Sequence, residues 1–108
     1  MAREVTVVRI YIHEAERGRR ATLMEELMGV LHGQHRVKGA TIFRGIAGFG
    51  ASGEVHTADL LRLTAELPLV IEFFDMPEVV DRVLAQIEGM VPADHVISWS
   101  ARLHGEAR

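Results

Sequence analysis

The 108-residue sequence contains no cysteine. This absence excludes disulfide bonds, thiolate nucleophiles and cysteine-ligated zinc. The apolar stretches are all shorter than the ~18 residues that a membrane-spanning helix needs. The first residues enter an alternating pattern without the apolar core of a signal peptide. We therefore expect a cytoplasmic protein with no direct membrane insertion.

Aromatic residues and excess positive charge are also scarce. The chain has four Phe, one Trp and one Tyr, and its formal net charge is −3. Nucleic-acid-binding domains usually combine a basic face with stacking aromatic side chains, so no nucleic-acid partner is expected. The hydrophobic content of 48% is that of an ordinary globular protein, and a chain of this length forms one domain, here residues 1–108.

Four segments have the composition and alternation of β-strands. They are 4–13, 37–46, 67–75 and 95–103. In the first segment Val8 and Ile10 fall on the face opposite to Arg9 and Tyr11, which is a period of two residues. In 67–75 both sides of the pleat are apolar, which is typical of a strand covered on both faces.

Two further segments have the period of a helix. Apolar residues recur at three-to-four spacing over 21–34 and over 79–90, which predicts two helices with one apolar face each. The first helix should end near Gly33. For the second, Asp75 is expected to act as the N-cap, and Pro77 suits the first turn, where a missing N–H costs nothing.

The predicted order of elements is β-α-β-β-α-β. Two β-α-β halves of this kind form an α+β, ferredoxin-like sandwich, a four-stranded antiparallel sheet with two helices on one face. The second face of the sheet stays bare and would carry Arg9, Tyr11, Val70, Glu72 and Phe74. Such a mixed face predicts self-association through the sheet, with Arg9 and Glu72 as partners.

Residues 45–54, GIAGFGASGE, contain the G-x-G-x-x-G spacing of dinucleotide-binding turns at Gly48, Gly50 and Gly53. That motif needs a following helix whose N-terminus receives the pyrophosphate. Here the stretch joins two strands that should pair as an antiparallel hairpin, so we reject the dinucleotide interpretation. Two others stay open: the glycines only permit a turn, or their backbone N–H groups form a nest for an anion.

Under the anion interpretation, each candidate ligand-binding residue offers a positive charge, a backbone N–H donor or a polar side chain in or next to the loop. They are Arg44, Gly45, Gly48, Gly50, Ser52, Gly53, His56 and Thr57. No cofactor is expected. His32 and His35 have no carboxylate at ligand spacing, so no metal site is predicted. No Ser-His-Asp spacing, nucleophile elbow or catalytic carboxylate pair stands out, which predicts no catalytic residues and no enzyme.

Several stretches carry a family resemblance. RGIAGFGASGEVHT (44–57), GAT (39–41), LPLVIEFFD (67–75) and RIYIHE (9–14) resemble domain-of-unknown-function family 190 (DUF190), and the resemblance covers residues 5–103. That family is similar to the PII nitrogen-regulatory signalling proteins, which are ferredoxin-like trimers. The resemblance implies a homotrimer with its sheets packed inward. It also implies a ligand-contacting loop between the second and third strands, and nucleotides in clefts between subunits.

The chain departs from the PII pattern in three places. After the shared glycine-phenylalanine-glycine, PII proteins have arginine, glutamine and lysine, whereas this chain has Ala51 and Ser52. The connection EGMVPADH (88–95) lacks the phosphate-binding lysine of the second PII nucleotide loop. The modifiable loop tyrosine is missing, since the only tyrosine, Tyr11, lies in a predicted strand.

Three functions follow from these observations. The first is a PII-like signalling or regulatory protein that binds a small anionic ligand at the glycine loop and reports it to a partner protein. The second is an accessory protein-interaction module without a small ligand. The association of family members with fluoride-export genes suggests that its partner would be a membrane transporter. The third is an enzyme with an active site between subunits.

Overall fold

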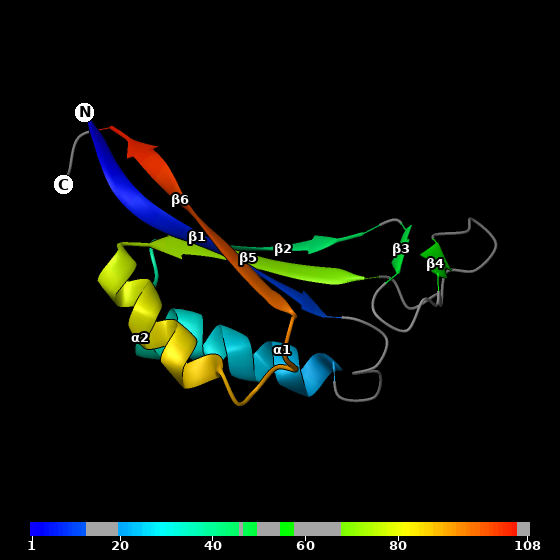
Figure 1. Cartoon of the computed structure of the whole chain (residues 1–108). Coiled ribbons are helices and arrows are strands. Elements are labelled where there is room, and N and C mark those ends of the chain that lie inside the picture. Colours follow the sequence, from blue (N-terminus) through cyan, green and yellow to red (C-terminus); the bar gives the residue numbers. More distant parts are fainter. Residues whose placement is uncertain (13–19, 46, 50–54, 58–67, 106–108) are drawn as a thin grey trace.

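The computed structural model describes residues 1–12, 20–45, 47–49, 55–57 and 68–105, with the backbone alone for 20–22, 47–49 and 55–57. Figure 1 shows the elements along the chain. They are β1 (Ala2–Ile12), α1 (Arg20–Met28), η2 (Gly29–Gln34), β2 (Gly39–Arg44), β3 (Ala47–Phe49), β4 (Val55–Thr57), β5 (Leu69–Asp75), α2 (Pro77–Ile87) and β6 (Val96–His104). None of the described helices is long and apolar enough to cross a membrane.

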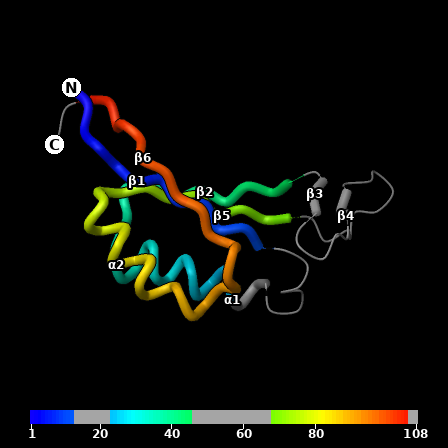
Figure 2. The backbone as a smooth tube through the Cα atoms, viewed as in Figure 1, coloured from blue at the N-terminus to red at the C-terminus, as the bar shows by residue number. Residues whose placement is uncertain are grey.

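The main sheet has four strands in the order β2-β5-β1-β6. Every neighbouring pair in it is antiparallel. Both helical segments lie on the same side of the sheet (Figures 1 and 2). This arrangement confirms the predicted ferredoxin-like α+β sandwich, because two crossover connections place their helices on one face.

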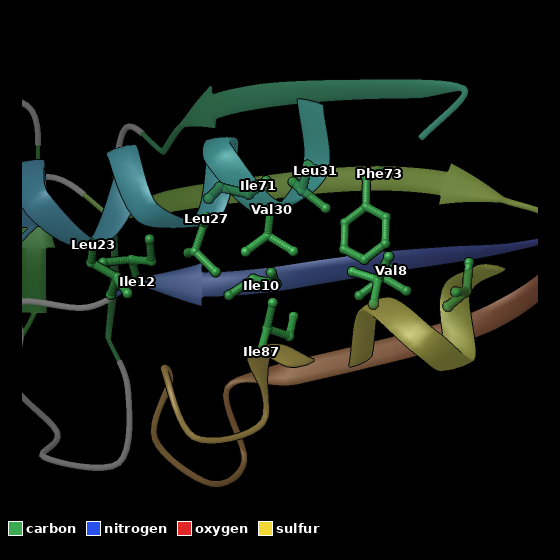
Figure 3. Packing of buried hydrophobic residues seen from close by; sticks show 12 residues of the cluster. Val8, Ile10, Ile12, Leu23, Leu27, Val30, Leu31, Ile71, Phe73 and Ile87 are labelled. Atoms are coloured by element: carbon green, nitrogen blue, oxygen red, sulfur yellow. The ribbon is translucent and has the colours of Figure 1, made fainter. Parts of the chain in front are cut away.

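The core fills the space between the sheet and the helices. The even-numbered residues Val8, Ile10 and Ile12 of β1 are at most 1% exposed. Figure 3 shows these side chains beside Leu27, Leu31 and Ile87 of the helices and Phe73 of β5. The period of two along β1 therefore directs one set of side chains into the core.

The first helix changes its hydrogen-bonding pattern part-way. It is α-helical to Met28 and continues through η2 as a π-helix. The His35 N–H donates to the carbonyl of Val30, five residues earlier, at 3.1 Å. The helix ends at Gln34, next to the predicted end at Gly33, but the π-helical turn was not predicted. Such turns interrupt α-helices locally and often lie near functional sites.

The prediction that Asp75 caps the second helix is wrong. Met76 is the N-cap residue, and no side chain caps this end. Asp75 is 6% exposed and accepts hydrogen bonds from the backbone N–H groups of Met76 at 2.6 Å and Lys38 at 3.0 Å. Its carboxylate therefore joins the end of β5 to the segment before β2, because it satisfies two backbone donors there.

The two ends of the described chain lie side by side. The Gly105 N–H donates to the carbonyl of Met1 at 3.0 Å, beyond the pairing of β1 with β6. Ile12, at the other end of β1, is paired with Leu69 of β5, and Leu69 is paired with Arg44 of β2. Along the strand direction, the two ends of the described chain therefore lie at one end of the sheet, and the end of β2 lies at the other.

Candidate functional site

The glycine-rich stretch forms a small hairpin of its own. β3 and β4 make a separate antiparallel two-stranded sheet, in which Ala47 pairs with Thr57, Gly48 with His56 and Phe49 with Val55. Figure 1 shows this hairpin beyond the ends of β2 and β5. The described element after the glycines is therefore a strand that pairs back on β3, as expected for a hairpin and not for a dinucleotide-binding turn.

The structure brings several predicted site residues together at this place. Gly48 lies directly opposite His56, and Thr57 is the next residue on the same strand. Arg44 ends β2 with an exposed side chain at the base of the hairpin. Gly50, Ser52 and Gly53 lie outside the described residues. The backbone thus places Arg44, Gly48, His56 and Thr57 in one region.

Gly45 has a structural role at the base of the hairpin. Its N–H donates to the carbonyl of Pro68 at 2.7 Å, which continues the pairing of β2 with β5 by one residue. A backbone donor that is used in a sheet is not free for a ligand. The predicted contribution of the Gly45 N–H to an anion site is therefore lost to the sheet.

The face of the sheet opposite to the helices carries a mixture of apolar and polar residues. We call it the open face. It comprises the odd-numbered residues from Arg3 to Tyr11, Thr41, Phe43, Val70, Glu72, Phe74 and the odd-numbered residues from Ile97 to Leu103. At its centre Arg9 Nε donates to Glu72 Oε1 at 2.7 Å. The predicted pairing of these two residues is confirmed.

Aromatic rings flank the Arg9 guanidinium. Its central carbon lies 5.5 Å from the centroid of the Trp99 ring and 5.9 Å from that of Phe43, distances typical of cation–π contacts. The hydrogen bond to Glu72, and after it one to Tyr11, raises the pKa of Arg9 above its usual value. Arg9 is therefore a fixed positive charge held by residues of all four strands.

A cavity of about 550 Å³ lies between the end of α2 and the start of β6. Its described lining is mostly apolar, with Glu88 and Asp94 as the charged members. No lysine or arginine is among the described lining residues, so the cavity offers no cation to a phosphate. The sequence already shows that the connection 88–95 contains no lysine. It does not indicate that a cavity lies there.

The histidines give no metal site in the described part of the chain. No group of three or more His, Asp or Glu residues there could hold an ion. His35 Nε2 lies 2.7 Å from Gln86 Oε1, and Gln86 in turn donates to Gln34. His35 is thus part of a contact between η2 and α2.

The sequence of the chain matches a known protein family over most of its length. The profile of the family described as DUF190, "Uncharacterized ACR", matches residues 5–103. The chain belongs to the DUF190 family. A UPF0166 protein of Methanocaldococcus jannaschii is 30% identical over 91 residues, which is 84% of this chain and 82% of that protein.

Solved structures share the fold of this DUF190 chain. CPII from Thiomonas intermedia, bound to ADP and bicarbonate, superposes with a TM-score of 0.63 at 16% identity and covers 95% of this chain and 89% of CPII. A putative PII-like signalling protein from Thermus thermophilus gives 0.55 at 18% identity, over 94% and 89% of the two chains. The fold is therefore that of PII-like proteins.

Proposed function

We propose that this DUF190 protein is a PII-like regulatory protein and not an enzyme. It binds a small anionic ligand at the β3–β4 hairpin, which we call the glycine hairpin, and in the cleft to a neighbouring subunit. The observation that carries the proposal is the position of Arg44, an exposed cation at the base of a hairpin in which Gly48 faces His56. Backbone N–H groups next to a cation form a site that suits an anion.

The proposed site consists of Arg44, Gly48, Gly50, Ser52, Gly53, His56 and Thr57. Gly45 lies at its base, where its N–H is bound by Pro68. Two ligands are suggested by CPII, whose structure holds ADP and bicarbonate. Bicarbonate fits the proposed site better, because one arginine can neutralise its single charge. The cavity at the end of α2 has carboxylates where a phosphate would need cations.

Titration calorimetry with bicarbonate, ADP, phosphate and fluoride tests this proposal. We expect heat from at least one anion, and binding at least ~10-fold weaker in Arg44→Ala, since a hydrogen bond to a charged group is worth about 1.5–3 kcal/mol. Arg82→Ala is the matched control, because Arg82 is an exposed arginine on α2. No heat from any of the four anions, or equal affinity in Arg44→Ala, would favour a module that docks on a protein without a ligand.

We also propose that the protein works as a homotrimer. The open face supports this, because Phe43, Ile97 and Trp99 on it are 41–48% exposed around the Arg9–Glu72 pair. Apolar patches of this kind usually mark an interface. Light scattering should give three times the 12.0 kDa of one chain.

A further inference from the structure

The cavity between the end of α2 and the start of β6, which we call the α2 cavity, has an apolar floor. Its lining includes Leu84 and Ile87 of α2, Val91 of the connection and Val96 of β6. Ile87 is 1% exposed, and the other three are partly buried and pack against the core. The floor of the cavity is therefore the edge of the core, where the chain turns from α2 back to β6 (Figure 1).

The rim of the α2 cavity is exposed and carries negative charge. Glu88 and Asp94 are both exposed, as are Ala85, Pro92 and Ala93 of the same lining. No lysine, arginine or histidine is among the described lining residues. An ionised carboxylate only accepts hydrogen bonds. Within the described lining, the two carboxylates thus have no positively charged neighbour.

The C-terminal end of α2 adds to this negative potential. The helix runs from Pro77 to Ile87, and its last turn contains no basic residue. The carbonyl end of a helix carries a partial negative charge, which lysine, arginine or histidine in the last turn commonly balances. Here the C-cap residue is Glu88, so a carboxylate lies there instead. Glu88, Asp94 and the helix end therefore act on the cavity with the same sign.

The position of Asp94 is set by the fold. Its φ of 68° is in the left-handed region, which Asp and Asn adopt more readily than most other residues. The carbonyl of the next residue, His95, accepts a hydrogen bond from the Tyr11 N–H at 2.8 Å. This bond ties the connection to β1 directly after Asp94. The backbone therefore holds this residue of the rim beside the first strand.

The volume of the α2 cavity is that of a small-molecule site. About 550 Å³ lies within the ~300–1,000 Å³ that such sites usually have. Small-molecule sites combine a mostly apolar lining with a few polar groups that orient the ligand. All the described lining residues except Glu88 and Asp94 are apolar. These two carboxylates therefore decide which chemical class of ligand fits.

From this arrangement we propose that the α2 cavity binds an amphipathic aliphatic amine, with the ammonium group at Glu88 and Asp94 and the hydrocarbon chain on the apolar floor. A phosphate or carboxylate ligand would be repelled by the same two side chains. A short diamine fits less well, because its second ammonium group would have to leave water for the apolar floor. The ligand is thus a monocation with a short aliphatic chain.

The α2 cavity is separate from the proposed anion site. Arg44 pairs with Leu69, which pairs with Ile12, and the register of β1 with β6 continued by two residues places Ile12 level with Asp94. Arg44 and Asp94 therefore lie on opposite edges of the sheet, roughly 14 Å apart at ~4.8 Å per strand. None of the described lining residues belongs to the open face. An amine can thus bind together with an anion, and association through the open face does not use the cavity.

Titration calorimetry with n-hexylammonium chloride tests the ligand class. We expect it to bind at least ~5-fold more tightly than n-hexanol, the factor that one exposed ion pair can supply. We expect n-propylammonium to bind at least ~10-fold more weakly, because each CH₂ that leaves water tightens binding up to ~4-fold. No heat from hexylammonium at ~10 mM, or equal affinity for n-hexanol or n-propylammonium, would overturn the proposal.

Uncharged variants of the rim test where the ammonium group binds. Glu88→Gln and Asp94→Asn keep the size of each side chain, and asparagine tolerates a positive φ. We expect the double variant to bind hexylammonium at least ~5-fold more weakly than the wild type. Asp81→Asn is the matched control, because Asp81 is an exposed carboxylate of α2 outside the described lining. Equal affinity in the double variant and in the control would overturn the role of the two carboxylates.

A larger side chain inside the cavity tests the apolar floor. Ala85 is an exposed lining residue of α2, so Ala85→Phe narrows the cavity without removing a core side chain. We expect this variant to lose the heat of hexylammonium binding. Arg82→Phe, on the same helix outside the described lining, is the matched control and should bind like the wild type. Unchanged binding in Ala85→Phe would contradict a ligand in this cavity.

Nuclear magnetic resonance of the wild type tests the location without a substitution, and it decides if circular dichroism shows that a variant does not fold. On addition of hexylammonium, we expect the amide signals of Val91 and Asp94 to shift and that of Gly48 to stay in place. Shifts at Gly48 without shifts at Val91 and Asp94 would overturn the proposal.

The outcomes also separate this inference from the proposed function. Arg44→Ala should keep the affinity for hexylammonium, and the double variant at Glu88 and Asp94 should keep the affinity for the anion. Loss of amine binding in Arg44→Ala would contradict a separate cavity site. Loss of anion binding alone would leave the amine site in place and remove only the proposed function.

Discussion

The two faces of the sheet have similar apolar residues in different surroundings. On the helix-covered face, Ile10, Ile71 and Phe73 are fully buried. On the open face, Phe43 and Trp99 are 45% and 41% exposed, although the chain alternates as regularly there. An apolar period of two therefore predicts which residues share a face, but not whether another part of the same chain covers that face.

The largest expected effect compares two phenylalanines on the two faces. Phe73→Ala should lower the free energy of unfolding by about 3–5 kcal/mol, because it leaves a cavity in a closed core. Phe43→Ala should cost less than about 1 kcal/mol in the separated chain, since its ring is half in water. Urea denaturation at several protein concentrations measures both. Equal losses in the dilute limit would mean that the faces do not differ as described.

A smaller loss is expected at Asp75, which lies on the helix-covered face at the end of β5. Asp75→Ala removes the buried acceptor of two backbone N–H groups, those of Lys38 and Met76. Leaving buried donors unsatisfied costs about 1–3 kcal/mol, whereas Asp75→Asn retains one acceptor oxygen and should lose less. Thermal unfolding compares the two variants. Equal stability of the alanine variant and the wild type would show that water replaces the carboxylate.

The smallest effect on stability is expected at the polar centre of the open face. Glu72→Gln removes the charge that holds Arg9 near Trp99, the only tryptophan of the chain. We expect a change in the wavelength or intensity of Trp99 emission with little loss of folding stability, because surface ion pairs contribute little. Glu88→Gln, on the helix side, is the control and should leave the emission unchanged. An unaltered spectrum in Glu72→Gln would mean that the pair does not position Arg9.

The same pair predicts how the emission responds to pH. The pKa of Arg9 is raised in the folded chain by its hydrogen bond to Glu72. The folded pKa of Arg9 thus lies above the usual value for arginine. Any stability that the charged Arg9 side chain contributes is fully present below its unfolded pKa, and it is lost only as the pH rises through the folded pKa. The Trp99 emission of the wild type should stay constant between about pH 7 and 9, well below that value. A transition in this range would contradict a persistent Arg9 charge beside the ring.

The sequence predicted the parts of the fold that follow from local periods. The strand alternation fixed which residues share a face, so the Arg9–Glu72 pair could be expected across β1 and β5. The role of Asp75 could not, because its partner Lys38 is 37 residues away and the contact depends on how β2 is placed. The π-helical turn was also missed, since Gly29–Gln34 has the apolar spacing of an ordinary helix.

The candidate site was predictable to a lesser extent. The sequence predicted that the strands on either side of the glycine stretch pair antiparallel, and β2 and β5 do so. The separate β3–β4 hairpin within the stretch, in which Gly48 pairs with His56, was not predicted. The engagement of the Gly45 N–H with Pro68 was not foreseen, because it depends on how far the β2–β5 ladder extends. Phe43 and Ile97 were missed as edge residues, although strand order in a ferredoxin-like sheet would have indicated them.

The closeness of Met1 and Gly105 has a practical consequence. Both lie at the end of β1 that is furthest along the sheet from Arg44 and the glycine hairpin. A surface tether or a fluorescent dye attached at residue 1 would therefore hold the molecule by the end opposite to the proposed binding region. Immobilised protein would present the hairpin to the solution, where an anion or a partner protein can reach it.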